Sequence, residues 1–178
     1  MAGPLEERFR TVRDLLPDYR VETTGGRIVV NESGTWQHNT IVFRLIRLLI
    51  GTVVDRGWEI WPNITVCTGG VDRYVPDLVV VPRSPLMRFD HAVQGDSTLL
   101  VADVVSADSA YDDHYVKPCG YAPAGVPLYL VLDPFQGAAT LFGEPSGGKY
   151  RSETVAAAGE PLVLPAPWDR AVDTAALW

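Results

Sequence analysis

Two segments of the chain have the apolar spacing of a helix. In the first, apolar side chains recur on one face: Leu5, Phe9, Val12 and Leu16. This pattern predicts an amphipathic helix over about residues 5–16 that ends before Pro17. The second segment, from Thr35 to about Arg56, is apolar at most positions between 41 and 54. A helix that is apolar over most of its circumference is expected to be mostly buried.

Short β-forming runs occupy much of the remaining chain. The runs YRVET (19–23) and RIVVN (27–31) flank a TGG turn and predict a hairpin. Four longer runs predict strands: WEIWPNITVCT (58–68), RYVPDLVVVP (73–82), TLLVADVVS (98–106) and VPLYLVLDP (126–134). The continuous Val and Leu residues of the second and third runs suit strands covered on both faces. Residues 138–155 predict another hairpin, turned at PSGG.

The other segments have weaker patterns. Residues 83–97 have the composition of a loop, and residues 107–125 have mixed helical character. The Pro-rich C-terminal tail, about residues 159–178, is expected to wrap the surface. The alternation of strands and helices predicts one α/β domain over residues 1–178, with a mixed β-sheet flanked by helices.

Composition indicates a folded protein without a membrane span. The chain has 178 residues, of which 47% are hydrophobic and 21% charged, enough for a sizeable core. Its N-terminal stretch has no apolar signal core, and its most apolar run contains Arg44 and Arg47 and is too short to cross a bilayer. We therefore expect a cytoplasmic location. Cys67 and Cys119 lack a metal or redox spacing, so we expect both to be reduced and buried.

Two lone acids lie within the apolar strand candidates. Asp77 precedes the Leu/Val run of RYVPDLVVVP, and Asp103 has a similar setting in VADVVS. If the two strands are neighbours, both carboxylates can meet at one end of the sheet, where their repulsion needs compensation. A divalent cation would supply it, since Mg²⁺ prefers one or two carboxylates together with waters and phosphate oxygens. The pair has the chemistry of metal-assisted phosphodiester cleavage.

Net charge limits how this chain could contact nucleic acid. A formal charge of −7 argues against a broad phosphate-binding surface, so any contact must be local or metal-assisted. Lys117 is a candidate for such a role, because lysine is rare here: two lysines stand against thirteen arginines. A compact ammonium can hold an attacking water or offset the charge on a phosphorane.

These candidates also have purely structural interpretations. Asp103 could pair with an arginine such as Arg73 and stabilise the fold without any metal. Lys117 could form a surface salt bridge with Asp112 or Asp113. Both interpretations remain open at this point.

Several blocks, taken in order, resemble the Uma-two family of restriction-endonuclease-like proteins, within the PD-(D/E)xK nuclease superfamily. The blocks are VETTGGRIVV, QHNTI, YVPDLVVVP, VADVVSADSAYDDHYVKPCGYAPAGVPLYLVLDP and PSGGKYRS, and they extend from about residue 15 onward. The resemblance implies a restriction-endonuclease-like core, in which a mixed sheet is flanked by helices.

The resemblance also implies roles for five residues. Asp77, the acid of the PD element, and Asp103 would bind the metal. The following helix would supply the catalytic Lys117, in a pattern like D…K…YA..G that four residues fit: Asp113, Lys117, Tyr121 and Gly125. Glu22 and His38 match recurrent family positions and would flank the metal or position the substrate. His38 could equally cap the second helix, because it falls in the first turn.

Two positions depart from the family pattern, and a third departs only from the pattern of the wider superfamily. Asp103 stands where the family usually has Glu, which shortens the ligand by one methylene. Val105 occupies the usual lysine position of the superfamily. Pro118 disfavours a helical conformation at the residue before it, so Lys117 could begin a helix instead of lying within one.

We therefore expect a Mg²⁺- or Mn²⁺-dependent endonuclease that hydrolyses phosphodiester bonds in DNA. The alternative is a catalytically inactive or weakened nuclease-fold protein that acts as a binding or interaction module, which the negative charge and the short Asp103 favour. We also expect a homodimer formed through the apolar helix at 41–54, because a two-fold dimer suits cleavage of a duplex.

Overall fold

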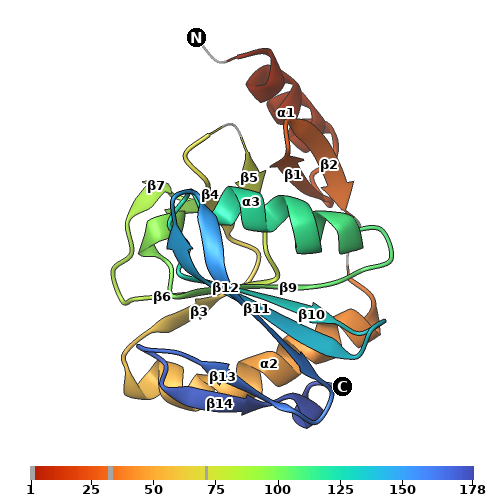
Figure 1. The fold of residues 1–178 in the computed structure, drawn as a ribbon. Coiled ribbons are helices and arrows are strands. Elements are labelled where there is room, and N and C mark those ends of the chain that lie inside the picture. Colours follow the sequence, from red (N-terminus) through yellow and green to blue (C-terminus); the bar gives the residue numbers. More distant parts are fainter. Residues whose placement is uncertain (1–2, 32–33, 71) are drawn as a thin grey trace.

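The computed structural model describes residues 3–31, 34–70 and 72–178, and within these ranges the strands form two six-stranded sheets and one two-stranded sheet. The middle layer is sheet B, with strand order β12-β11-β10-β9-β6-β3 (Figure 1). Its strands are β12 Lys149–Ala157, β11 Ala138–Ser146, β10 Leu128–Asp133, β9 Leu100–Val104, β6 Leu78–Val81 and β3 Glu59–Trp61. The β9–β10 pair is parallel and the other pairs are antiparallel, so the sheet is mixed.

Sheet B separates two hydrophobic cores, because successive side chains of a strand point to opposite faces. Even-numbered residues of β6, β9 and β10 pack with helix α2 (Trp36–Asp55), and their odd-numbered apolar residues pack on the side of helix α3 (Lys117–Tyr121). Figure 1 shows α3 above the sheet and α2 below it. Asp103 has an odd number on β9, and it accordingly faces α3.

Helix α2 begins at its N-cap Thr35, whose side chain accepts a hydrogen bond from the His38 backbone amide at 3.3 Å. One row of side chains is buried: Ile41, Leu45, Leu49 and Val53. The expectation that this helix is mostly buried is wrong, because Phe43, Ile50 and Val54 are 59%, 43% and 67% exposed. The apolar residues on its outer side face solvent instead of sheet B.

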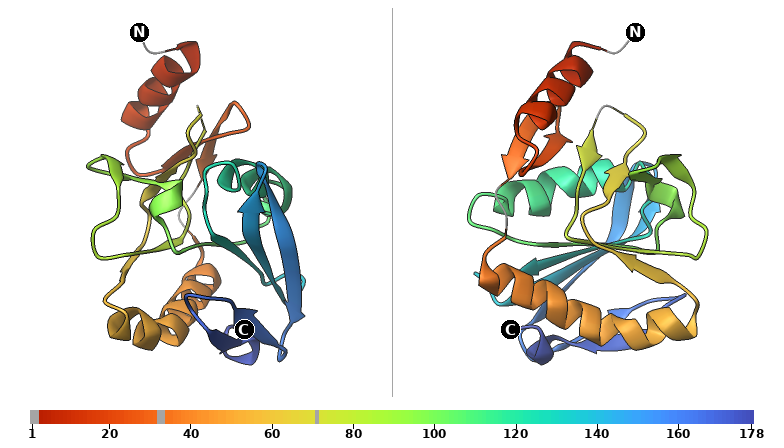
Figure 2. Two further views of the ribbon diagram at one scale, coloured as in Figure 1. Left: turned by 60° about the vertical axis from the view of Figure 1, so that its left-hand side comes forward. Right: turned by 180° about the vertical axis from the view of Figure 1, so that it is seen from behind.

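Sheet A and helix α1 (Pro4–Leu15) lie on the opposite side of sheet B from α2 (Figure 2). The strand order of sheet A is β2-β1-β5-β4-β8-β7. Its strands are β1 Arg20–Thr24, β2 Arg27–Asn31, β5 Arg73–Tyr74, β4 Thr65–Cys67, β8 Ala92–Gln94 and β7 Met87–Phe89. The structure confirms the predicted first helix, which buries Phe9, and the predicted β1–β2 hairpin.

Two predicted strands each divide between the two sheets. The run 58–68 forms β3 and β4, and the run 73–82 forms β5 and β6. A proline lies at each break: Pro62, beside Asn63 with φ of 53°, and Pro76. Because proline cannot donate to a strand ladder, the chain leaves one sheet there and enters the other. The single sheet predicted from the sequence is therefore two sheets.

Two further segments also differ from prediction. The predicted loop at 83–97 contains β7, β8 and a 3₁₀ turn at Gly95–Ser97. The tail forms a hairpin of β13 (Pro161–Leu164) and β14 (Arg170–Asp173), followed by a 3₁₀ turn at Thr174–Ala176. It does not wrap the surface, because its apolar side chains enter the core beside α2: Leu162, Leu164, Trp168, Val172 and Leu177.

The remaining predicted elements are confirmed, namely strands β9 and β10 and the β11–β12 hairpin. Both cysteines are free, as expected. Cys67 is buried, but the prediction for Cys119 is wrong, because its side chain on α3 is exposed. Within the described ranges, no helix has the length and hydropathy that a membrane span requires.

Candidate active site

Asp77 lies in the connection between β5 and β6, where the chain passes from sheet A to sheet B. Its Oδ1 accepts a hydrogen bond from Arg20 Nη1 at 2.7 Å. Its Oδ2 lies 3.0 Å from His38 Nε2 and accepts a bond from the Val104 backbone amide at 2.8 Å. Burial alone would raise the pKa of Asp77, but His38 and Arg20 outweigh burial and lower this pKa to about 2. The carboxylate is therefore ionised at neutral pH.

Asp103 lies beside Asp77, as the sequence-based hypothesis required. Strands β6 and β9 pair antiparallel in a register that sets the two acids at adjoining strand ends. Asp103 is buried, with Lys117 Nζ 3.0 Å from its Oδ1 and a hydrogen bond at 3.1 Å from the Tyr129 hydroxyl to its Oδ2. Burial raises the pKa of Asp103 to about 7, although the Lys117 charge acts in the opposite direction.

The backbone around Lys117 accommodates the proline that follows it. A π-helical turn spans Asp112–Val116, and the Lys117 amide bonds to the Asp112 carbonyl five residues back. Pro118 follows within the first turn of α3, where its missing amide hydrogen costs little. Lys117 therefore has helical angles, with φ −61° and ψ −40°, and it is the first residue of α3.

The Lys117 ammonium lies between two buried carboxylates. Its Nζ is 3.0 Å from Asp103 Oδ1 and 2.8 Å from Asp113 Oδ1. The Ser109 hydroxyl donates to the other oxygen of Asp113 at 2.5 Å. Burial alone would lower the pKa of Lys117, but Asp103, Glu22 and Asp113 raise it well above its ordinary value. The ammonium therefore stays protonated at neutral pH.

Glu22 approaches this group from β1. It is buried and accepts hydrogen bonds from the Val75 backbone amide and from Asn31 Nδ2, each at 2.6 Å. Arg20 lies between two acids, since its Nε is 3.9 Å from Glu22 Oε2 and its Nη1 bonds to Asp77. Glu22 thus holds the β5–β6 connection in place and shares a cation with Asp77.

His38 takes part in two interactions at the start of α2. Its backbone amide donates to the N-cap side chain, and its ring contacts Asp77. The hydrogen bond to Asp77 raises the pKa of His38, while burial opposes this shift. Its Nδ1 is buried and has no hydrogen-bond partner among the residues described.

All five residues proposed from the sequence meet in this cluster: Glu22, His38, Asp77, Asp103 and Lys117. A small cavity of about 20 Å³ beside Glu22 and Lys117 has room for about one water. Sequence reasoning missed Arg20 and Tyr129. Arg20 had a usable signal, because residues two apart on a strand share a face with each other, as Arg20 and Glu22 do. Tyr129 had none beyond its place in an apolar strand.

The pairs formed by Asp103 and Lys117 differ from those of the purely structural interpretations. Arg73 pairs with Glu6 at 2.7 Å, whereas Asp103 pairs with Lys117. Lys117 does contact Asp113, but the pair lies in the interior and not at the surface.

Comparisons with known proteins identify the family and the fold of this chain. A family model described as "Putative restriction endonuclease" matches residues 7–173. This chain belongs to the Uma2 family. Among solved structures, the Uma2 chain is similar to a "putative nuclease belonging to DUF820" from Anabaena variabilis, with a TM-score of 0.69 and 14% sequence identity over 88% of each chain. The search of curated proteins gave no match. The predicted family is confirmed, and so is the predicted fold class, α/β with a mixed sheet flanked by helices, although the strands form two large sheets where one was predicted.

The donor set of this Uma2 chain fits a small, hard cation. Asp77 and Asp103 offer carboxylate oxygens, the ligands that Mg²⁺ prefers. A carboxylate has about four lone-pair sites; Asp103 Oδ2 accepts a hydrogen bond from Tyr129, whereas its buried Oδ1 has no hydrogen-bond partner among the described residues and lies 3.0 Å from Lys117 Nζ. Among the described residues, no three His, Cys, Asp or Glu side chains are grouped to hold a metal. Waters or substrate oxygens would therefore have to complete the coordination.

Proposed function

We propose that this Uma2 protein is a Mg²⁺- or Mn²⁺-dependent endonuclease that hydrolyses phosphodiester bonds in DNA. The observation that carries the proposal is the pair of carboxylates at adjoining strand ends, Asp77 and Asp103, with the Lys117 ammonium 3.0 Å from the second. Membership of a family whose description is "Putative restriction endonuclease" supports a nuclease.

Each residue of the cluster has a chemical task in this proposal. Asp77 and Asp103 would hold the metal, which when bound supplies a Lewis acid for the phosphoryl oxygen and acidifies a water. Lys117 acts as a hydrogen-bond donor and not as a base, because the surrounding acids keep it protonated. Its ammonium offsets the negative charge that develops on the phosphoryl oxygens when water attacks and a bridging P–O bond breaks. The water gives its hydroxyl group to phosphorus and, through solvent, its proton to the leaving oxygen. Glu22 orients that water, and His38 fixes the Asp77 carboxylate.

Plasmid cleavage tests the proposal directly. Supercoiled plasmid is incubated with the protein and Mg²⁺, Mn²⁺ or EDTA, and nicked and linear products are measured on gels. Asp77→Ala should abolish cleavage, whereas Asp55→Ala, an exposed acid at the end of α2, should leave it unchanged. Circular dichroism establishes that both variants fold. Equal cleavage by the wild type and Asp77→Ala would reject the assignment.

A second candidate function is a binding module without catalysis. The burial of the acid pair favours it, because Asp77 and Asp103 are only 7% and 1% exposed and each already contacts a cationic side chain. Calorimetric titration with Mn²⁺ separates the two functions. An endonuclease should bind Mn²⁺ with heat that Asp77→Ala removes, and a binding module should release no such heat.

We further propose that the chain acts as a single domain, in the cytoplasm, and as a homodimer. The dimer would use the outer side of α2, where Trp36, Phe43, Ile50 and Val54 are 74%, 59%, 43% and 67% exposed and follow one another at seven-, seven- and four-residue spacing. Burial of such a stripe between two copies would remove it from water. Sedimentation of Phe43→Glu should then show a monomer where the wild type is a dimer, and a monomeric wild type would overturn the proposal.

A further inference from the structure

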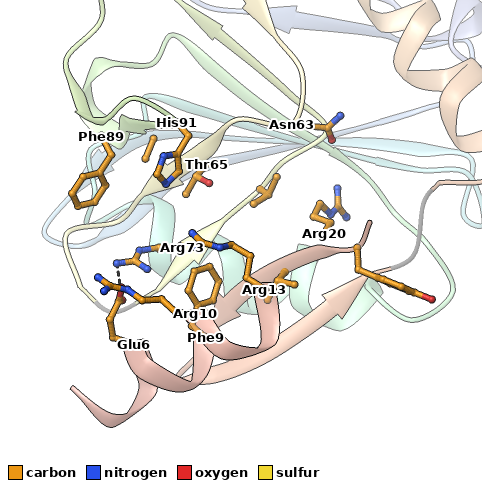
Figure 3. A pocket seen from close by; sticks show the side chains of 14 residues that line it. Glu6, Phe9, Arg10, Arg13, Arg20, Asn63, Thr65, Arg73, Phe89 and His91 are labelled. Carbon is orange, nitrogen blue, oxygen red and sulfur yellow. Dashed lines mark hydrogen bonds and ion pairs between the residues drawn. The ribbon is translucent and has the colours of Figure 1, made fainter. Parts of the chain in front are cut away.

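A pocket of about 550 Å³ lies between helix α1 and sheet A, and we call it the arginine pocket (Figure 3). Four arginines and one glutamate line it: Arg10, Arg13, Arg20, Arg73 and Glu6. The chain as a whole has a net charge of −7, so this excess of positive charge is local. Its size falls within the range of about 300–1,000 Å³ typical of ligand sites.

The two arginines of α1 are available to a ligand. The side chains of Arg10 and Arg13 are 61% and 48% exposed, and their acidic partners, Glu6 and Asp14, are bound through surface contacts of 3.0 and 3.2 Å. Surface pairs of this kind contribute little stability, so a phosphate can replace the carboxylate at small cost. Arg73 is more firmly held, between Glu6 at 2.7 Å and the ring of Phe9 at 5.3 Å.

Aromatic rings form the opposite wall. Phe89 and His91 stack with ring centroids 6.0 Å apart and an interplanar angle of 16°. Figure 3 shows both rings across the pocket from Glu6, Phe9, Arg10 and Arg13. Phe89 is 48% exposed, and His91 is exposed as well. Flat aromatic surfaces beside arginines are what unpaired bases and their phosphates require, whereas the bases of a duplex already stack on one another.

The arginine pocket reaches the candidate active site through one residue. Arg20 lines this pocket and also the small cavity beside Lys117. Its guanidinium contacts Asp77 at 2.7 Å. A phosphate at the Arg20 end of the pocket would therefore lie next to the proposed metal ligands.

We propose that the arginine pocket binds a single-stranded stretch of nucleic acid, with phosphates on Arg10 and Arg13 and an unpaired base on the Phe89–His91 stack. The strand would extend toward Arg20 and the acids behind it. Binding of a single strand in the pocket is inferred from the geometry of the pocket alone, whereas the direction of the strand toward Arg20 rests on the proposed nuclease function.

Fluorescence anisotropy in EDTA tests the pocket without cleavage. Three fluorescein-labelled probes are used: a single-stranded DNA 12-mer of thymidine, a single-stranded RNA 12-mer of uridine, and a 12-bp DNA duplex. Arg10→Gln with Arg13→Gln should weaken binding of the single strands by about 10-fold and reduce the salt slope by about 1.4, since each lost phosphate contact removes about 0.7. The control, Arg8→Gln with Lys149→Gln, makes the same change in charge at exposed positions outside the pocket and should have little effect.

A second pair of variants tests the base contact. Phe89→Ala with His91→Ala should weaken binding of the single strands by about 5- to 100-fold through lost stacking. Phe135→Ala, another exposed aromatic outside the pocket, should have no effect. The two single-stranded probes show whether the pocket discriminates DNA from RNA, and preference for either supports the proposal.

Two outcomes would overturn it: duplex binding as tight as single-strand binding, or single-strand binding that neither pocket variant weakens more than its control. The fate of the nuclease proposal is read separately. If Asp77→Ala loses plasmid cleavage and the pocket variants bind as wild type does, the pocket proposal is rejected and the nuclease proposal is supported. If the pocket variants weaken binding and no metal-dependent cleavage is found, the pocket proposal is supported and the nuclease proposal is rejected.

Discussion

Replacing Lys117 by methionine tests whether the ammonium is what keeps two buried acids compatible with the fold. Methionine has a similar length and fills the same space without the charge. Asp103 and Asp113, each 1% exposed, would then share a site with no cation between them. Removing one partner of a buried ion pair costs about 3–5 kcal/mol, because a charge is left uncompensated. With a urea m-value of about 2 kcal/mol per molar, the unfolding midpoint should fall by about 2 M.

The loss should depend on pH, and its direction follows from Asp103. Its pKa in the folded protein, about 7, lies above the ordinary value of 3.8, and the Lys117 charge lowers it. In Lys117→Met this pKa rises further. A folded-state pKa above the unfolded value means that the folded protein binds more protons, so stability falls as pH rises through the folded pKa. Between wild type and Lys117→Met, this effect should widen the gap in unfolding free energy by about 1.4 kcal/mol per pH unit above pH 7, so the gap should be larger at pH 8 than at pH 5.

Urea unfolding followed by circular dichroism measures both effects. Lys149→Met, a change at an exposed lysine on β12, provides the control and should shift the midpoint little at either pH. Adding Asp113→Asn to Lys117→Met should restore part of the stability, since one of the two opposed charges is then absent. A Lys117→Met protein as stable as wild type at pH 8 would refute the idea that the ammonium compensates these acids.

Three further outcomes follow from burial and charge elsewhere in the molecule. Trp168→Ala should destabilise the fold by about 3–5 kcal/mol because it empties a core position. The Val163 side chain is 62% exposed, so Val163→Ala should change the unfolding free energy by about 0.5 kcal/mol or less. Equal effects of the two substitutions would contradict the packing of the tail. A thiol reagent should modify Cys119 quickly in the native protein and Cys67 only on unfolding, because Cys67 is buried and burial raises its pKa. Rapid reaction of both thiols would contradict the burial of Cys67. The pKa of Asp77 is lowered from 3.8 to about 2, which should contribute about 2 kcal/mol of stability above pH 4 that is lost as pH falls toward 2. Acid titration should therefore narrow the gap in unfolding free energy between wild type and Asp77→Asn. A gap that stays constant would count against the ion pairs of Asp77.

Local patterns were sufficient for the elements whose signals lie within a few residues. The spacing of apolar residues placed α1 and α2, and the TGG and PSGG turns placed the two predicted hairpins. Local patterns failed at Pro62 and Pro76, where one apolar run serves two sheets, and in the tail, where a Pro-rich composition conceals buried side chains. Burial depends on what another part of the chain supplies, and composition contains no such information.

In the candidate site, too, the sequence identified some features and only the tertiary structure revealed the others. Apolar settings and family blocks were enough to single out Asp77, Asp103 and Lys117, since the type of a residue and its neighbours are visible along the chain. That Arg20 contacts an acid 57 residues away, and that one ammonium serves two carboxylates, appeared only once the strands were paired and the helix was docked. Charge interactions depend on separation in space and on the loss of surrounding water, and folding alone sets both.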